Sequence, residues 1–205
     1  MHSIERASET AALGLRRGRW PSGTQAALVD SVTNDADPRV RAAALGALVR
    51  RGSDSAARKA ITIAFGDSEP SVRRRAAELC VARSDTTLID AALAALDDSE
   101  PLVVEMAAWA LGEFGEPSSV DALAAVALDH VDPLAREAAV AALGAIGDPA
   151  ALPTILSATT DKPAIRRRAV LALAPFEGPE VEAALERALT DRDWQVRQAA
   201  EDLIG

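Results

Sequence analysis

A proline that follows a short acidic or polar turn recurs along this chain at intervals of 30 to 32 residues, each time introducing the same apolar spacing. In the last instance a tryptophan takes the place of the proline. A fixed period of this size indicates a repeat architecture, in which one unit cannot bury its apolar face alone and must stack on its neighbours. The anchor residues are Pro38, Pro70, Pro101, Pro133, Pro163 and Trp194.

Each repeat unit is predicted to form two helices joined by a short break. Proline at the first helical position sacrifices no hydrogen bond, and the acidic or polar residues before it can cap the helix. Apolar or small residues follow at two, six, nine and ten places beyond the anchor, which is the spacing of one helical face. Second helices are predicted over 118–129 and 151–160, the latter with Pro153 in its first turn, where proline is tolerated.

The composition favours closely packed helices. Hydrophobic residues make up 49% of the chain, but aromatic residues only 3%, and tyrosine is absent. A core built mostly from Ala, Leu and Val suits helices and supplies little for a sandwich or barrel. We therefore predict an all-α fold, a right-handed α-α superhelix (HEAT-like solenoid) of about six and a half helical hairpins, with the second helix of each unit on the concave side.

The ends of the predicted array differ from its middle. Seven places past the anchor the inner units carry an apolar residue, whereas the last unit carries Glu201, as expected where no further unit covers that face. Residues 3–34 match the pattern poorly and are interpreted as a diverged N-terminal cap. We expect one domain over 1–205, with repeats at 35–65, 66–96, 97–128, 129–160 and 161–190 and a half repeat at 191–205.

The signature D-x-x-P-x-V-R-x-x-A-x-x-A-L resembles the short HEAT-like repeats named after phycobilisome lyases. It covers 35–205 in full and 3–34 weakly. The resemblance implies the solenoid fold. It implies little about function, because similar proteins include chromophore lyases, hydroxylases and scaffolds.

An arginine three places past the anchor recurs in most units, and most units begin with an aspartate. A row of arginines could bind phosphate, but we favour a ladder of Arg–Asp pairs that ties successive units together. In the third unit Val104 replaces the arginine. The arginines are Arg41, Arg73, Arg136, Arg166 and Arg197, and the aspartates are Asp35, Asp67, Asp98 and Asp191.

Two arginine triplets, 73–75 and 166–168, occupy equivalent places in their units. HEAT-like DNA glycosylases raise the question of nucleic-acid binding. A net charge of −9 opposes binding to a polyanion, and no basic stripe runs along the array. We expect solvated helix faces at the triplets and no nucleic-acid partner.

The segment between Arg83 and Arg136 contains eleven acidic residues and no lysine or arginine. Trp109 lies within this segment, at a place where the other units carry side chains of varied chemistry, so we expect it to face solvent. An exposed tryptophan with apolar neighbours and an acidic rim is typical of a binding hot spot. Packing of the indole over an alanine-rich surface is the alternative. The candidate partner-binding residues are Trp109, Met106, Leu102, Glu105, Glu113, Asp90 and Asp121.

The side-chain inventory offers no catalytic or metal site. His2 and His130 are the only histidines, too few for the repeated His-Glu iron ligands of a HEAT-repeat hydroxylase. The acidic trio at 97–100 lacks an EF-type calcium loop and is interpreted as a helix cap. The single cysteine, Cys80, excludes an internal disulfide and is interpreted as a buried apolar residue. We expect no cofactor and no enzymatic activity.

These observations predict a protein-interaction module, a scaffold that binds a basic protein partner. A bilin-lyase-like or cofactor-attachment chaperone subunit is the alternative, and a nucleic-acid-binding protein is a third. The N-terminal segment lacks the apolar region of a secretory signal, and no apolar run approaches the roughly 18 residues of a membrane span. We therefore expect a cytoplasmic protein with no membrane partner. The sequence leaves the oligomeric state open, with a monomer favoured.

Overall fold

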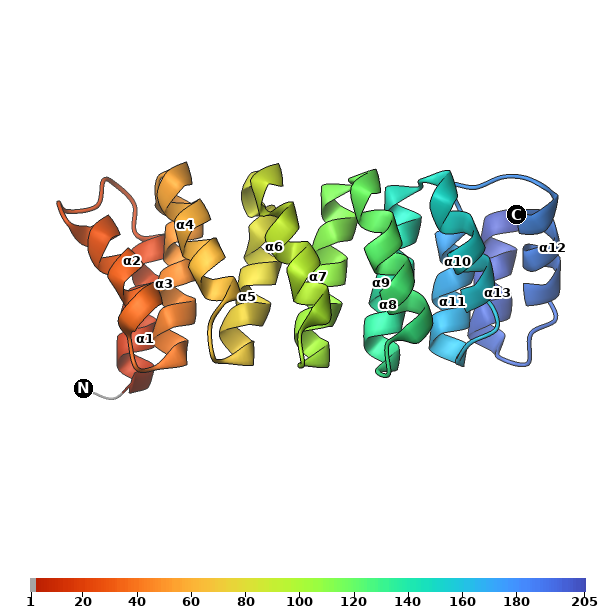
Figure 1. Ribbon diagram of the computed structural model, residues 1–205, viewed down its shortest axis with the longest axis horizontal. Helices are drawn as coiled ribbons and strands as arrows, with labels where there is room; N and C mark the ends of the chain where they lie inside the picture. Colours follow the sequence, from red (N-terminus) through yellow and green to blue (C-terminus); the bar gives the residue numbers. More distant parts are fainter. Residues whose placement is uncertain (1–2) are drawn as a thin grey trace. The chain divides into compact units, whose positions relative to one another are not determined.

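The computed structural model describes residues 3–205, and every regular element within that range is helical. His2 lies outside the described residues. The fold class predicted from the repeat, an all-α solenoid, is confirmed. The backbone divides into two compact units: the N-terminal unit ends at Ala95, and the C-terminal unit spans Leu96–Gly205. Figure 1 labels their helices.

The N-terminal unit contains six α-helices, whose connections include short 3-10 turns at Val81–Arg83 and Thr86–Leu88. The proline-led helices of the repeat begin at their prolines, as predicted. The helices are α1 (Ser3–Leu15), α2 (Thr24–Asn34), α3 (Pro38–Arg51), α4 (Asp54–Phe65), α5 (Pro70–Cys80) and α6 (Ile89–Ala94).

The C-terminal unit contains seven α-helices, and two of its second helices are preceded by 3-10 turns at Pro117–Ser119 and Pro149–Ala151. Pro153 lies in the first turn of its helix, as predicted. The helices are α7 (Pro101–Phe114), α8 (Val120–Asp129), α9 (Pro133–Ile146), α10 (Leu152–Ala158), α11 (Pro163–Ala172), α12 (Pro179–Ala188) and α13 (Trp194–Ile204).

Aspartates cap several of the anchor helices. The side chains of Asp37, Asp132 and Asp193 each accept a hydrogen bond from the backbone N–H two residues further on. Such a cap satisfies a donor that the first helical turn would otherwise leave without an acceptor. The aspartate before these three anchors is therefore a helix-start signal that the structure uses, whereas Glu69, Glu100 and Lys162 form no side-chain cap.

The apolar face of the anchor helices is buried as the spacing predicts. The alanine six places beyond each anchor has no solvent exposure, which brings neighbouring helices close together. Glu201, which replaces the apolar residue in the last repeat, is exposed. The six alanines are Ala44, Ala76, Ala107, Ala139, Ala169 and Ala200.

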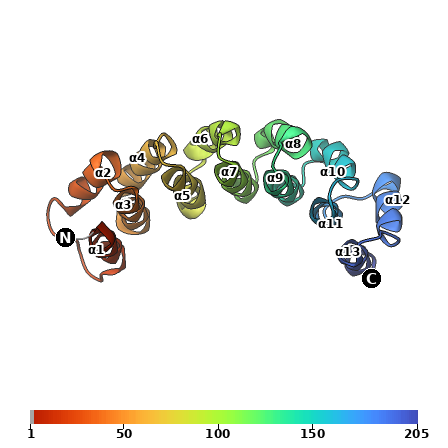
Figure 2. The same ribbon diagram turned by 90° about the horizontal axis from the view of Figure 1, so that it is seen from below.

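The helices of each unit form two rows. Figure 2 shows α1, α3 and α5 in one row of the N-terminal unit, and α7, α9, α11 and α13 in one row of the C-terminal unit. Within each unit this row lies on the inner side of the curve and the second helices lie on the outer side. The expectation that second helices line the concave side is therefore wrong.

The inner rows are closely spaced because glycines let the backbones touch. A Cβ atom built on Gly112 of α7 would lie 2.9 Å from the Cα of Ala142 in α9. A Cβ on Gly144 of α9 would lie 2.7 Å from the Cα of Ala172 in α11. Because these helices approach more closely than a side chain would allow, each row of anchor helices is the shorter one, and the unit curves toward it.

Candidate functional site

The candidate site is built on α7, whose exposed face belongs to the inner row. Leu102 is 51% exposed and Trp109 is 41% exposed, whereas Val103 and Ala110, their neighbours in sequence, are fully buried. Leu102 and Trp109 are two helical turns apart and therefore share a face. The prediction that Trp109 faces solvent is confirmed. Met106 lies between them and is half-buried.

The neighbouring helix α9 extends this apolar face. Leu134 is 53% exposed and stands one place past its anchor, as Leu102 does on α7. The two helices are adjacent in the inner row (Figure 2), and their backbones touch near Gly112. The candidates predicted from the sequence do not include Leu134. The signal was present in the shared position of the two leucines.

Two carboxylates flank Trp109 on α7. Glu105 is half-buried and Glu113 is exposed, each one helical turn from the indole. Within residues 3–205 neither side chain pairs with a lysine or arginine. On α9 the equivalent of Glu105 is Glu137, which accepts a long hydrogen bond of 3.4 Å from Nη2 of Arg168. The unpaired negative charge of this face is therefore concentrated on α7.

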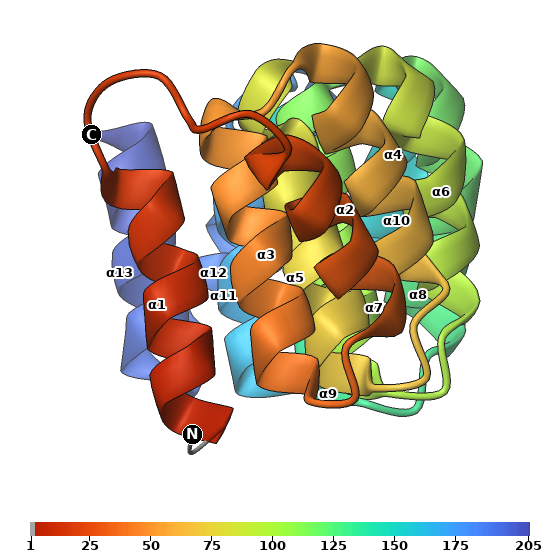
Figure 3. The same ribbon diagram turned by 90° about the vertical axis from the view of Figure 1, so that its left-hand side faces the viewer.

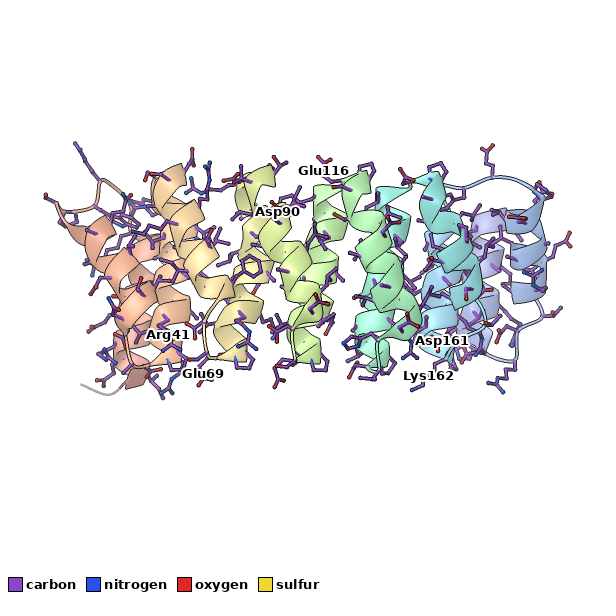
Figure 4. All side chains as sticks on the ribbon, viewed as in Figure 1. Arg41, Glu69, Asp90, Glu116, Asp161 and Lys162 are labelled. Atoms are coloured by element: carbon purple, nitrogen blue, oxygen red, sulfur yellow. The ribbon has the colours of Figure 1, made fainter. Side chains whose placement is uncertain are left out.

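The remaining acidic candidates belong to other elements than α7 and α9. Asp121 is exposed on α8, in the other row of the unit. Asp90 is exposed on α6 and belongs to the N-terminal unit (Figure 4). Glu116 lies in the turn after α7, at the opposite end of the helices from Asp161 (Figure 4). The acidic stretch of the sequence is thus divided between the two compact units, and within the C-terminal unit it lies in both rows of helices.

The Arg–Asp ladder predicted from the repeat is present inside each unit. Arg41 donates from Nε and Nη2 to Asp67 at 2.7 and 2.6 Å. Arg136 binds Asp161 in the same way at 2.8 and 3.0 Å. Figure 4 labels Arg41 near the start of α3 and Asp161 in the loop before α11. Both pairs are largely buried. The interpretation of the arginine row as a structural ladder is therefore confirmed for Arg41 and Arg136.

The ladder perturbs the carboxyl groups that it holds. Burial alone would raise the pKa of Asp67, but hydrogen bonds from Arg41 and a backbone N–H bring that pKa below its ordinary value. The hydrogen bond from Arg136 lowers the pKa of Asp161, and the one from Arg166 lowers the pKa of Asp191. All three aspartates therefore favour the charged form in the folded protein.

The ladder includes residues that the repeat pattern does not predict. Arg6 of α1 binds Asp35 through Nη1 and Nη2 at 2.8 and 3.2 Å, so the segment interpreted as a diverged cap keeps the contact of a full repeat. Asp161 stands two places before its anchor, whereas the predicted aspartates stand three places before theirs, so the repeat pattern does not include it. The prediction of a solvated face at 166–168 is wrong for Arg166, which is only 7% exposed.

The contact between α7 and α9 lacks the ladder pair. Val104 occupies the arginine position and is fully buried. His130 occupies the aspartate position. Its Nδ1 accepts a 3.1 Å hydrogen bond from the N–H of Asp132, as an aspartate oxygen accepts the equivalent bond in other repeats. Both partners have therefore been replaced together, and no unpaired charge is left in this contact.

Cys80 is a free and fully buried thiol, as predicted, and burial raises its pKa to about 12. Among residues 3–205 no group of three or more His, Cys, Asp or Glu side chains is placed to hold a metal ion. None of the helices described for this chain has the length and apolar character needed to cross a membrane.

Solved structures share the fold. YibA of Escherichia coli is 17% identical, with a TM-score of 0.66 over 98% of this chain and 74% of that chain. The complex of CpcE and CpcF of phycocyanin lyase from Nostoc is 23% identical, with a TM-score of 0.64 over 90% and 77%. A designed armadillo repeat protein in complex with peptide (KR)4 is 18% identical, with a TM-score of 0.63 over 88% and 98%.

Curated proteins include none that matches this sequence. The family model for HEAT repeats matches residues 57–143 and 126–205. These two matches overlap and together cover more than half of the chain, including all of the C-terminal unit. The repeat period, the paired helices and the match agree, and the chain belongs to the HEAT-repeat family.

Proposed function

We propose that this protein is a non-catalytic scaffold that docks a basic segment of a partner protein on the α7–α9 face, formed by Leu102, Glu105, Trp109, Glu113 and Leu134. The observation that carries the proposal is the exposed indole of Trp109 between two unpaired carboxylates. Partly exposed tryptophans with an apolar surround contribute strongly to protein interfaces because they bury a large area at a low cost in conformational entropy.

The charge of the C-terminal unit supports a basic partner. Residues 96–205 contain 20 acidic and 8 basic side chains, whereas residues 1–95 contain 11 acidic and 14 basic side chains. A negative field around the α7–α9 face would raise the rate at which a basic segment associates, and the buried indole contact would then slow its release. The designed armadillo protein bound to peptide (KR)4 provides a related fold that accommodates a basic peptide.

The proposal is tested with a fluorescently labelled (KR)4 peptide and the full chain. Trp109→Ala should weaken binding by about tenfold or more, the loss typical of an interface hot spot. Glu105→Gln with Glu113→Gln should weaken binding mainly at low salt, because salt screens exposed charges. Anisotropy titrations at two salt concentrations measure both effects.

Matched variants separate the face from general charge and hydrophobicity. Trp194→Ala removes another exposed tryptophan, and Glu182→Gln with Glu186→Gln removes two exposed carboxylates from α12 in the outer row. These controls should bind the peptide like the unmodified protein. If they lose as much affinity as the α7 variants, the peptide follows net charge and the site assignment fails.

A second candidate function is a bilin-lyase-like subunit or a chaperone that assists cofactor attachment. The similarity to the CpcE and CpcF subunits supports it at the level of the fold. Mixing the protein with a linear tetrapyrrole tests it, because a bound bilin changes its absorbance spectrum.

We place the protein in the cytoplasm, since its one cysteine is a buried, free thiol.

A further inference from the structure

The carboxyl ends of α1 and α3 gather a group of arginines at one end of the N-terminal unit. Arg16, Arg17 and Arg19 are exposed in the loop that joins α1 to α2, and Arg50 is exposed in the last turn of α3. Nη1 of Arg50 lies 3.1 Å from the position of a Cβ built on Gly14. The arginine of α3 therefore stands beside the end of α1, next to the loop.

Arg51 and Trp20 hold this loop in place. Arg51 donates hydrogen bonds to the backbone carbonyls of Leu13, at 3.2 Å, and of Gly18. Its guanidinium lies over the ring of Trp20, 5.1 Å from the centroid, and the indole N–H of Trp20 also donates to the carbonyl of Leu13, at 2.9 Å. Figure 3 shows the loop arching beyond the ends of the helices that it joins.

The charge at this end is not neutralised by nearby carboxylates. The side chains of Arg16, Arg17, Arg19 and Arg50 have no hydrogen-bond acceptor or ion-pair partner within residues 3–205. Asp54, at the start of α4, pairs with Arg83. The helix dipole stabilises Arg50 and Arg51 in the last turn of α3, but it does not account for three further arginines in a loop.

An exposed apolar side chain stands among these charges. Leu15 ends α1, directly before Arg16, and is 71% exposed. A protruding leucine flanked by guanidinium groups fits the boundary of an anionic bilayer, where the apolar chain enters among the lipid tails and the arginines bind phosphates. Clusters of about four to eight lysines or arginines are typical of segments that bind anionic lipid. A nucleic acid offers phosphates but no apolar layer for Leu15.

We propose that the end of the N-terminal unit formed by Leu15, Arg16, Arg17, Arg19 and Arg50 is a docking surface for an anionic lipid bilayer. Binding is peripheral and reversible, because one leucine and a basic cluster fall well short of a membrane-spanning helix. This surface goes beyond the proposed scaffold function and differs from the expectation of no membrane partner. Arg50 and Arg51, in the last turn of α3, lie more than 30 residues from the arginines of the loop in sequence, and only the fold brings them to the loop.

The proposal is tested by sedimentation of the full chain with vesicles of phosphatidylcholine and phosphatidylglycerol. The protein should bind the mixed vesicles at low salt, bind more weakly at high salt, and ignore vesicles of phosphatidylcholine alone. Arg16→Gln, Arg17→Gln and Arg19→Gln combined should weaken vesicle binding about 100-fold, at about fivefold for each arginine. No binding to the mixed vesicles at low salt overturns the proposal.

Two comparisons make the test specific. The combined variant Arg74→Gln, Arg187→Gln and Arg192→Gln removes three exposed arginines elsewhere and should leave vesicle binding unchanged within about twofold. Leu15→Ser should weaken binding to vesicles but not to a single-stranded DNA oligonucleotide. Equal losses in both triple variants, or tighter binding to the oligonucleotide than to vesicles, would refute a lipid surface. Trp109→Ala should not affect vesicle binding, which separates this proposal from the scaffold function.

Discussion

Arg166 binds Asp191 through two parallel hydrogen bonds, from Nε to Oδ2 at 2.8 Å and from Nη2 to Oδ1 at 2.7 Å. The side chains are 8% and 16% exposed, so water screens this pair weakly. The pair joins the start of α11 to the loop before α13 and repeats the contact of Arg136 with Asp161. Arginine forms this planar, two-bonded contact better than lysine does.

Loss of this arginine should destabilise the C-terminal unit. Arg166→Ala leaves the carboxylate of Asp191 partly buried without its partner, which we expect to lower the free energy of unfolding by about 2 to 3 kcal/mol. Urea denaturation followed by circular dichroism measures the change. Arg167→Ala, at a half-exposed neighbour outside the ladder, should cost less than about 0.5 kcal/mol. Equal losses for the two variants would show that the ladder does not contribute specifically.

The ladder predicts a pH dependence of stability. The pKa values of Asp67, Asp161 and Asp191 are lowered in the folded protein, so their contribution is fully present above the unfolded pKa of about 3.9. It is lost as the pH falls through the lower, folded values. We expect a constant unfolding free energy between about pH 5 and pH 7 and a decrease below about pH 4. In the Arg166→Ala variant the unfolding free energy should decrease less steeply at low pH, because Asp191 then titrates closer to its ordinary pKa.

The missing pair between α7 and α9 can be restored as a test of the ladder geometry. Val104→Arg alone should lower the unfolding free energy by about 2 to 4 kcal/mol, since it buries a charge without a partner. His130→Asp supplies a carboxylate at the position where other repeats carry an aspartate. In the double variant we expect the two changes to couple favourably by about 1 to 3 kcal/mol. A double-mutant cycle from urea denaturation measures this coupling, and strictly additive effects would contradict the shared geometry.

The close helix contacts predict opposite effects of alanine at two helical glycines. A Cβ at position 144 would lie 2.6 Å from the Cβ of Ala172, so we expect Gly144→Ala to cost about 1 kcal/mol or more despite its better helix propensity. At Gly46 the nearest atom to an added Cβ is the flexible Nη2 of Arg75, at 3.4 Å. Gly46→Ala should therefore stabilise the protein by about 0.5 to 1 kcal/mol. Thermal and urea denaturation decide between these signs.

The sequence predicted part of the α7–α9 face and missed the rest for a physical reason. Leu102, Glu105 and Trp109 are on one helix, so their common face follows from helical periodicity. Leu134 belongs to another helix, and its contribution depends on how α7 and α9 pack. Asp121 was assigned from charge density along the chain, which does not distinguish the inner row of helices from the outer one.

The sequence by itself determined the repeat, the helix starts at the prolines, the buried alanines and the exposure of Glu201. These features depend on the spacing of residue types along the chain, which can be read from the sequence itself. Only the tertiary structure decided which row of helices is the inner one, because that depends on backbone contacts such as Gly144 with Ala172. It also decided that Arg50 stands beside Gly14 near the end of α1, since residues distant in the chain meet only when the helices pack.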